Sequence, residues 1–474
     1  MRTQRLSSIL LLALIVCCVP APASTSGYVN DKLTPEQLIE DVDFYVKTLQ
    51  ETHINPFVHV PEAEWRAQVD RIKSQITKQG AMTREDFWLI FAPLVSSLQD
   101  RHTVVVEPRF LLQNNTTKYL PVRTVYLNRK LVVTSSVADV QIAPGTVITS
   151  INHMNAEDVV RKLSQYTYGS DKERMRSAGA WLWIGASEVF GKPETFALTF
   201  SDGRSVELKG QTLSEIAEKE RATKTQTGNA PLDLQFLDGN VAYVNASTFS
   251  YDLQKYEVLL NDVFTRIKAA GARHLIVDVR SNTGGNSMLG NALLDMFNAK
   301  PFKTYAATWK RSAQYVEKMR NDGVTLPDRY LALKPGDLLT IESSTVTPRE
   351  SRLRFTGDGY ILSGEETFSS GLNFLGTVKD NKLAKIIGEQ PTTPACFPGE
   401  LYIFKLPNSG LRVTSSVKYW MAPAGCKGER PLAPDVVVTK QVEDYATGKD
   451  RILDKALDLI RTPRRAEGRG RSRK

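Results

Sequence analysis

The stretch LIVDVRSNTGGN, residues 275–286, decides the fold class. Its apolar residues are typical of a buried strand, and this strand ends in Asp278 and Arg280. Gly284 and Gly285 follow, and they lead into a helical pattern. Glycines at such a junction let backbone N–H groups face a ligand, and the helix dipole adds positive character there. The turn is therefore expected to be a phosphate cradle, an oxyanion hole or a plain tight turn.

Strand and helix patterns alternate from residue 233 to the end of the folded chain. Further strands are expected in GNVAYVNAS (239–247), FKTYAATW (302–309), GYILSG (359–364), KLAKIIGE (382–389) and PDVVV (434–438). Helices are expected at 252–270, at 287–298, from residue 370 onward and at about 450–461. Alternation of this kind predicts a sheet covered by helices, which is an α/β fold.

The N-terminal half has a different organisation. Three helices are expected between residues 34 and 101, the first of them opened by Thr34 and a capping-box Gln37. Residues 118–210 contain short strand patterns and one capped helix, which predicts a small β-rich unit. The polar stretch 211–232 is expected to be a linker or an exposed helix and loop.

Two adjacent serines lie in ILSGEETFSSGLNF, residues 361–374, between a strand pattern and a helix pattern. A serine at a helix N-terminus meets free N–H groups that favour a developing negative charge. Ser369 or Ser370 is therefore a candidate nucleophile, and a simple helix cap is the alternative. A nucleophilic serine needs a base, which is usually histidine. The chain offers His53, His59, His102, His153 and His274.

Both ends of the chain carry positive charge that does not belong to the folded body. Residues 1–23 have the basic, apolar and small-residue regions of a secretory signal peptide, so the mature protein is expected to be secreted or periplasmic without a membrane span. Cys17 offers a lipoprotein alternative, but Val16 stands before it where a small residue is needed. The basic tail, residues 462–474, is expected to be disordered. The net charge of +9 comes mainly from these two ends, so no basic face for nucleic acid is expected.

Cysteine and motif content excludes several kinds of site. Once the signal peptide is removed, Cys396 and Cys426 remain, and an exported protein is expected to pair them, with two buried thiols as the alternative. The chain contains no His-Glu-x-x-His or Cys-x-x-Cys motif, so neither a metal nor a cofactor is expected. A P-loop and the Gly-x-Ser-x-Gly turn of α/β-hydrolases are absent as well.

Taken together, several stretches resemble a known family. LQDRHTVV, IAPGTVITSINHMNAEDVVRKL, LIVDVRSNTGGN, ILSGEETFSSGLNF, LAKIIGE, LPNSGLRV and ERPLAPDVVV occur in the order seen in tail-specific, or C-terminal processing, serine peptidases. The closer resemblance is to the branch related to the tricorn core and the retinoid-binding repeats. It implies a helical subdomain over 24–110, a PDZ-like domain over 111–212 and a crotonase-like (ClpP-like) α/β catalytic core over 213–461.

The resemblance also implies roles for residues. Ser369 matches the nucleophile of the family, and His102 matches the base of the tricorn-like branch. The N–H group of Ser370 and that of Gly284 or Gly285 match the oxyanion hole. Glu429 is the nearest match to a relay glutamate. The lysine that another branch uses is replaced by Pro394, and Arg101 stands where the tricorn-like branch has a serine.

These features predict an exported serine endopeptidase that cleaves peptide bonds through an acyl-enzyme on Ser369, with His102 as base. Peptide or protein substrates are expected as partners, and the PDZ-like unit suggests that their C-termini are bound by strand addition. Two alternatives remain. One is a non-catalytic protein that binds peptides or an apolar ligand on the same scaffold, and the other is a phosphate or acyl-thioester site at Gly284 and Gly285.

Overall fold

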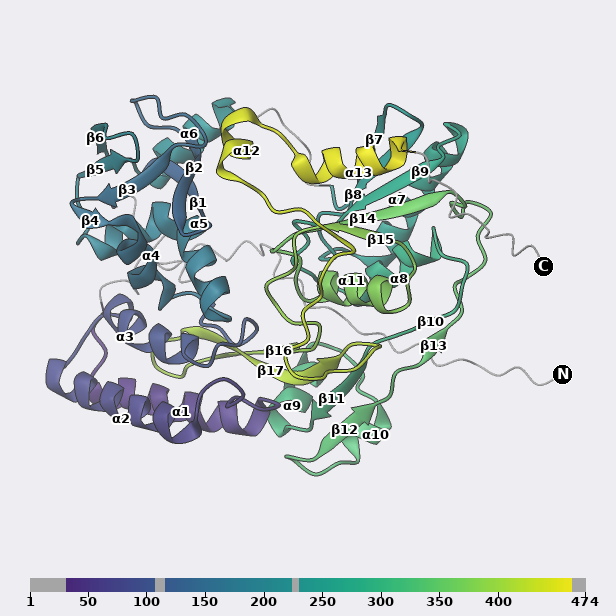
Figure 1. The fold of residues 1–474 in the computed structure, drawn as a ribbon. Coiled ribbons are helices and arrows are strands. Elements are labelled where there is room, and N and C mark those ends of the chain that lie inside the picture. Colours follow the sequence, from purple (N-terminus) through teal and green to yellow (C-terminus); the bar gives the residue numbers. More distant parts are fainter. Residues whose placement is uncertain (1–30, 107–115, 224–229, 463–474) are drawn as a thin grey trace, which may run out of the picture.

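The computed structural model describes residues 31–106, 116–223 and 230–462, which form a helical part, a β-rich part and a larger α/β part (Figure 1). The expected signal peptide and the basic tail beyond Thr462 lie outside the described residues. No helix of the described part is both long and apolar enough to cross a membrane.

The N-terminal part contains the three expected helices. They are α1 (Pro35–Thr52), α2 (Glu62–Gln79) and α3 (Arg84–Ser96). The first helix opens with the predicted capping box between Thr34 and Gln37. The apolar faces of these helices enclose Tyr45, Trp65 and Phe91, and this core also includes Phe404 and Val413 from a distant hairpin. The helical part is therefore packed against the C-terminal half of the chain and is not a separate body.

Residues 116–223, called the β-rich unit here, form an antiparallel sheet with the order β1-β2-β3-β5-β6 and with β4 paired to β3. Its strands are β1 (Val122–Leu127), β2 (Lys130–Ser136), β3 (Val147–Ile151), β4 (Met154–Asn155), β5 (Thr195–Phe200) and β6 (Ser205–Lys209). Its helices are α4 (Ala156–Ser164), α5 (Asp171–Val189) and α6 (Leu213–Thr223). The expectation of a single helix is wrong, because α5 spans 19 residues. The capping box of Ser170 and Glu173 at its start was the available signal.

The largest part contains a second six-stranded sheet with the order β18-β15-β14-β9-β8-β7. Its strands are β7 (Asp233–Leu237), β8 (Val241–Asn245), β9 (His274–Asp278), β14 (Asp358–Ser363), β15 (Lys385–Gly388) and β18 (Val436–Val437). All neighbours are parallel except β7 and β8. This arrangement confirms the α/β class and places the loops after β9 and β14 at the same edge.

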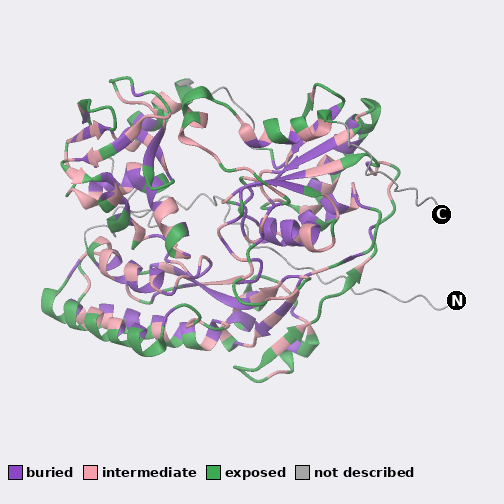
Figure 2. Cartoon of the chain, viewed as in Figure 1, coloured by how far each residue is buried: buried purple, intermediate pink, exposed green. Residues whose placement is uncertain are grey.

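Helices cover both faces of this sheet, as Figure 1 shows. One face packs against α7 (Leu253–Ala269), α8 (Ser287–Asp295) and α11 (Ser370–Asp380). The opposite face packs against α13 (Arg451–Arg461), which follows the short helix α12 (Val442–Thr447). The strands and α11 are mostly buried in Figure 2. The start of α11 is therefore anchored in the packed core, which is what a rigid site requires.

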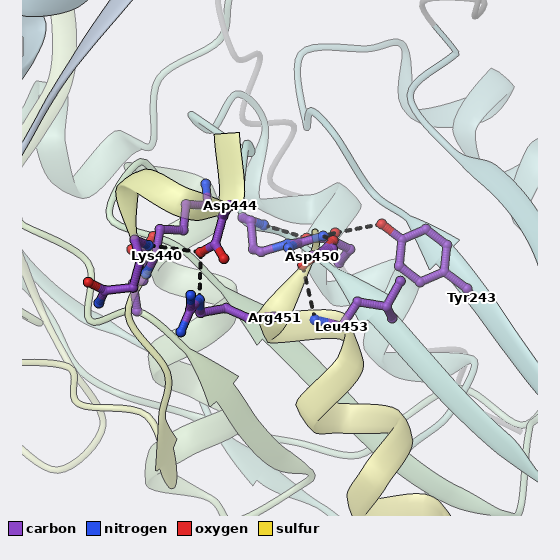
Figure 3. Close-up of polar contacts among 10 residues, drawn as sticks. Tyr243, Lys440, Asp444, Asp450, Arg451 and Leu453 are labelled. Atoms are coloured by element: carbon purple, nitrogen blue, oxygen red, sulfur yellow. Dashed lines mark hydrogen bonds and ion pairs between the residues drawn. The ribbon is translucent and has the colours of Figure 1, made fainter. Parts of the chain in front are cut away.

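A polar cluster fixes α13 to the end of β9. Arg280 binds Asp278 and also reaches Asp450, at 2.7 and 2.8 Å. Asp450 caps α13 by accepting a hydrogen bond from the N–H of Leu453 (Figure 3). Tyr243 donates to Asp278 from the neighbouring strand β8. The cluster thus anchors the chain shortly before Gly284.

A four-stranded antiparallel sheet with the order β12-β11-β17-β16 joins this core to the helical part. Its strands are β11 (Ala306–Lys310), β12 (Leu338–Ile341), β16 (Phe397–Lys405) and β17 (Arg412–Met421). Around it lie β10 (Phe302–Lys303), β13 (Thr345–Val346), α9 (Ala313–Asn321) and α10 (Asp328–Leu331). The long β16–β17 hairpin is not predicted by the sequence patterns. It matters because it brings Phe397 and Pro398 to the residues described next.

Candidate active site

Ser369 stands between β14 and α11, at the N-cap position of α11, but its side chain does not cap the helix. Its backbone has φ 52° and ψ −123°, a conformation that is costly for a residue with a Cβ, by about 1–3 kcal/mol. Neighbouring hydrogen bonds hold it there, since Phe368 donates to the Asn282 carbonyl and Asn373 donates to the Ser369 carbonyl. The fold thus maintains strain at Ser369, which is half-buried.

His102 faces the Ser369 hydroxyl. The turn that follows α3 places its Nε2 atom 3.1 Å from Ser369 Oγ. The imidazole stacks on Phe368, with ring centroids 4.4 Å apart, and lies nearly parallel to Phe397 at 5.9 Å. The ring also makes a hydrogen bond with the backbone of Pro398, and proline offers only a carbonyl for this contact. This carbonyl takes a ring N–H, so the nitrogen nearest to Ser369 is left free to accept a proton.

Asp100 binds the backbone of His102, and the sequence analysis did not single it out as a site residue. Its Oδ1 accepts the backbone N–H of His102 at 2.8 Å. Its Oδ2 contacts His53 Nε2 at 2.9 Å, and it accepts from Thr103 and Ser416 at 2.7 and 2.6 Å. Burial raises the pKa of Asp100, but the net effect of its neighbours is to lower it. The lowering comes from the hydrogen bond and charge of His53, the charge of His102 and the hydrogen bond from Ser416. A permanent negative charge therefore lies close to His102.

The electrostatic surroundings keep His102 neutral. Burial lowers the pKa of His102 below 6.5, because the charged ring would lose its hydration. Asp100 raises this pKa, whereas the neighbouring Arg101 lowers it again. Arg101 lies over the Phe368 ring at 4.1 Å and contacts Glu173 at 3.5 Å. At neutral pH the imidazole is therefore unprotonated, as a general base must be.

Gly284 and Gly285 pass directly beside the serine pair. A Cβ on Gly284 would lie 2.6 Å from Ser369 Cβ and 2.9 Å from Ser370 N, so only glycine allows this approach. Both glycines have positive φ, of 107° and 131°. Ser370 Oγ donates to the Gly285 carbonyl at 2.5 Å, which fixes the two loops together.

The backbone donors at this junction are not equivalent. The N–H of Gly284 is already bound to Asn282 Oδ1 at 2.9 Å. The N–H groups of Gly285 and Ser370 have no acceptor among the residues that the structure describes. Two free donors beside a serine hydroxyl have the composition of an oxyanion hole.

Glu429 is not brought to His102. Its side chain is 72% exposed and pairs with His59 Nδ1 at 3.3 Å. Within the described ranges no hydrogen bond joins it to His102, whose surroundings are occupied by Asp100 and the Pro398 backbone. Spacing along the chain could not reveal this, because the loop that carries Glu429 has no regular structure of its own.

The remaining predicted residues have the following positions. Cys396 and Cys426 form a disulfide with Cα atoms 5.9 Å apart, which ties the start of β16 to the loop before Glu429. His153 lies in the turn between β3 and β4, and His274 begins β9 beside Asp358. Across residues 31–106, 116–223 and 230–462, no cluster of three or more His, Cys, Asp or Glu side chains could hold a metal ion.

A protein-family model matches part of the chain. Residues 240–438, which carry Ser369, Gly284 and Gly285, match peptidase family S41. The predicted resemblance and the predicted class of enzyme, a serine-type peptidase, are confirmed.

Solved structures with TM-scores above 0.6 share the fold of this chain. The crystal structure of mature CPAF is similar with a TM-score of 0.63 and 14% identity, over 90% of this chain and 97% of that chain. Mature CPAF complexed with lactacystin gives a TM-score of 0.62 and 15% identity, over 90% and 99% of the two chains. The photosystem II D1 C-terminal processing protease has a TM-score of 0.45 at 15% identity, over 88% and 98%. No curated protein sequence matches the chain.

Proposed function

We propose that this chain is an exported serine endopeptidase of the tail-specific, tricorn-like type. The observation that carries the proposal is the 3.1 Å contact between Ser369 Oγ and His102 Nε2. This distance is within the hydrogen-bonding range of a nucleophile and its base. It joins residues that are 267 positions apart in the chain, so local structure alone does not explain it.

In the proposed reaction, Ser369 Oγ attacks the carbonyl carbon of a peptide bond while His102 Nε2 takes the hydroxyl proton. The developing oxyanion accepts hydrogen bonds from the N–H groups of Ser370 and Gly285. His102 then returns the proton to the leaving amine, which departs and leaves an acyl-enzyme on Ser369. Water then gives a proton to His102 and attacks the acyl carbon. His102 returns this proton to Ser369 Oγ as the bond to the acyl carbon breaks, which releases the second product and regenerates the serine.

Asp100 replaces Glu429 in our account as the carboxylate that supports the base. It holds the backbone of His102, and its charge stabilises the imidazolium that forms when the proton is transferred. Asp100 accepts the backbone N–H of His102 and makes no hydrogen bond to its ring among the described residues, so it acts as a positioning and electrostatic residue. Pro398 supplies the acceptor for the ring instead.

Export is supported by two features. The first is the signal-like sequence of residues 1–23, and the second is the disulfide between Cys396 and Cys426. Disulfides persist in oxidising compartments and are rare in the cytosol. The β-rich unit is proposed to act as the PDZ-like domain that binds substrate C-termini. Equal cleavage of substrates with free and amidated C-termini would remove this part of the proposal.

The function is tested with an unfolded protein as substrate. The mature protein is expected to produce peptide fragments by internal cleavage, and Ser369→Ala is expected to produce none. Mass spectrometry of the fragments reads out the result. If wild type and Ser369→Ala are equally inert, the alternative of a non-catalytic peptide-binding protein is favoured. Equal activity of both would assign the cleavage to another group or to a contaminant.

A further inference from the structure

A cavity of about 280 Å³ lies between the helical part and the β-rich unit. It is lined from one side by Trp88 and Leu89 of α3, and from the other by Trp181 and Glu188 of α5. Tyr166 and Tyr168, from the segment between α4 and α5, complete the wall. Nothing in the reaction above uses this cavity, although its size approaches that of ligand pockets in general.

The walls of the cavity are mainly aromatic. The rings of Trp88 and Tyr166 stack with centroids 5.0 Å apart. The Tyr168 hydroxyl donates a hydrogen bond to the Val105 carbonyl at 3.2 Å, so only the aromatic ring is available to contact a ligand. Trp181 is 39% exposed, which is unusual for so large an apolar side chain. These surfaces favour a bulky apolar group.

The charged side chains among the described lining residues are already paired. Arg101 contacts Glu173 at 3.5 Å, and Glu188 contacts Lys192 at 4.0 Å. Burial raises the pKa of Glu188 to about 7, with Lys192 opposing this change and Glu85 adding to it. No unpaired charge is therefore offered to a charged side chain, which makes a neutral occupant the better match.

Arg101 connects the cavity to the catalytic pair. It lines the cavity, and its guanidinium lies 4.1 Å above the ring of Phe368. Phe368 precedes Ser369 in the chain and stacks on His102 at 4.4 Å. Only the side chains of Arg101 and Phe368 therefore lie between the cavity and a substrate bound at Ser369. A few residues of extended peptide can span this separation.

A second observation points to a polar partner at the same place. Trp88 is 7% exposed, and its Nε1–H has no hydrogen-bond acceptor among the residues that the structure describes. Buried indole N–H groups usually find a partner. A peptide backbone carbonyl would supply this acceptor while its side chain fills the aromatic walls.

We propose that this cavity is a specificity subsite that takes one bulky apolar side chain of the peptide substrate, at a fixed position from the cleaved bond. The inference rests on the proposed peptidase function. It predicts that cleavage sites share a residue such as Phe, Leu or Met at that position.

The test is a profile of cleavage sites in unfolded proteins, determined by mass spectrometry. Ser177→Phe fills the cavity from α5, because Ser177 lines it. This variant is expected to lower the ratio of cleavage at bulky to small residues by ~10-fold, as large changes in an apolar pocket do. Ser205→Phe is the matched control, since Ser205 is exposed on β6 of the same unit, and it is expected to keep the wild-type ratio. Active sites in each sample are titrated with a small fluorophosphonate.

Two more variants test the cavity independently of Ser177→Phe. Trp181→Ala removes one wall, and it is expected to reduce the same preference if Ser177→Phe does not fold. Trp88→Phe keeps an aromatic ring without the N–H, and it is expected to raise KM with little change in kcat. A wild-type profile without a bulky-residue preference, or a Ser177→Phe profile equal to wild type, would overturn the subsite. Failure of the fluorophosphonate to react with wild type would instead remove the proposed function itself.

Discussion

Ser369 Oγ and His102 Nε2 lie 3.1 Å apart, although one atom belongs to the start of a core helix and the other to a turn after the helical part. The His102 ring packs against both Phe368 and Phe397, which contact each other with centroids 6.3 Å apart, and these contacts limit the movement of the imidazole. Because these contacts come from three separate segments, the site exists only in the folded chain, as spatial triads do.

The first prediction concerns the serine and its base as one unit. His102→Ala and Ser369→Ala are each expected to lower kcat by ~10⁴-fold or more, and the double variant is expected to be no worse than either single variant. Steady-state kinetics on a fluorogenic peptide provides the measurement. Full additivity of the two losses would mean that the residues act independently.

The second prediction concerns pH. His102 must be neutral to take the proton. Burial is the largest effect and lowers the pKa of His102 below 6.5. The charge of Arg101 lowers this pKa further, whereas the charge of Asp100 raises it. The acid limb of kcat/KM is therefore expected at a pH below 6.5. Arg101→Gln removes the positive charge and leaves Glu173 unbalanced, and both effects raise the pKa of His102. The limb should then move to higher pH, and a movement to lower pH would contradict this electrostatic account.

The third prediction concerns Asp100. Asp100→Asn removes a buried charge that accepts four hydrogen bonds, and it is expected to lower both kcat and the free energy of unfolding, the latter by about 1.5–3 kcal/mol. The folded-state pKa of Asp100 is lowered, so its stabilising effect is present at neutral pH and is lost as the pH falls through that value. The variant should therefore lose less stability in acid than wild type does.

Glu429→Gln is the matched control for Asp100→Asn, because it makes the same change at an exposed carboxylate. Its kcat and unfolding curve are expected to equal those of wild type. If instead Glu429→Gln lowers kcat and Asp100→Asn does not, the relay runs through Glu429 and the support by Asp100 is refuted.

The fourth prediction concerns the glycine turn. Gly284→Ala would place a Cβ 2.6 Å from that of Ser369, at a φ of 107° that alanine rarely adopts. The collision displaces the nucleophile and the adjacent N–H of Ser370, so kcat is expected to fall by ~10²–10³-fold, the effect of one lost oxyanion donor. Gly323→Ala is a control at an open turn with a φ of 71°, where a Cβ meets nothing within 4 Å. Retention of wild-type kcat in Gly284→Ala would show that the turn has no catalytic role.

The fifth prediction concerns the disulfide. Replacing Cys396 and Cys426 together by Ser opens a loop closed over 30 residues, which is expected to cost about 3–4 kcal/mol on the chain-entropy model. Cys396 precedes Phe397, so activity is expected to fall as well, and mild reduction of wild type should lower activity before it unfolds the protein. Denaturant unfolding and kinetics of the double variant measure both effects. Kinetics unchanged from wild type would show that the bridge stabilises the fold without supporting His102.

The sequence predicted those features that depend on local pattern. The strand before Gly284, the helix after Ser369 and the capping box at Thr34 all appear at the expected residues. Helix α5 was missed because glycine, serine and alanine interrupt its apolar pattern, and because the strands around it dominate the region.

Features that depend on contacts between distant segments could not be predicted. Asp100 looked like a polar helix end, and its role appears only when Ser416 from β17 and His53 from the end of α1 are placed beside it. The Pro398 carbonyl offers no sequence signal, since any residue has one. Glu429 has the right residue type and nearly the right spacing, but its irregular loop directs it to His59 at the surface.

The most direct test of the central claim is the mass of the intact protein after incubation with a serine-directed fluorophosphonate, followed by peptide mapping. We predict one adduct per wild-type chain, located on Ser369, and no adduct at the same exposure in His102→Ala. An unmodified wild-type protein, or an adduct on Ser370 with Ser369 free, would contradict the assignment of Ser369 as the nucleophile activated by His102.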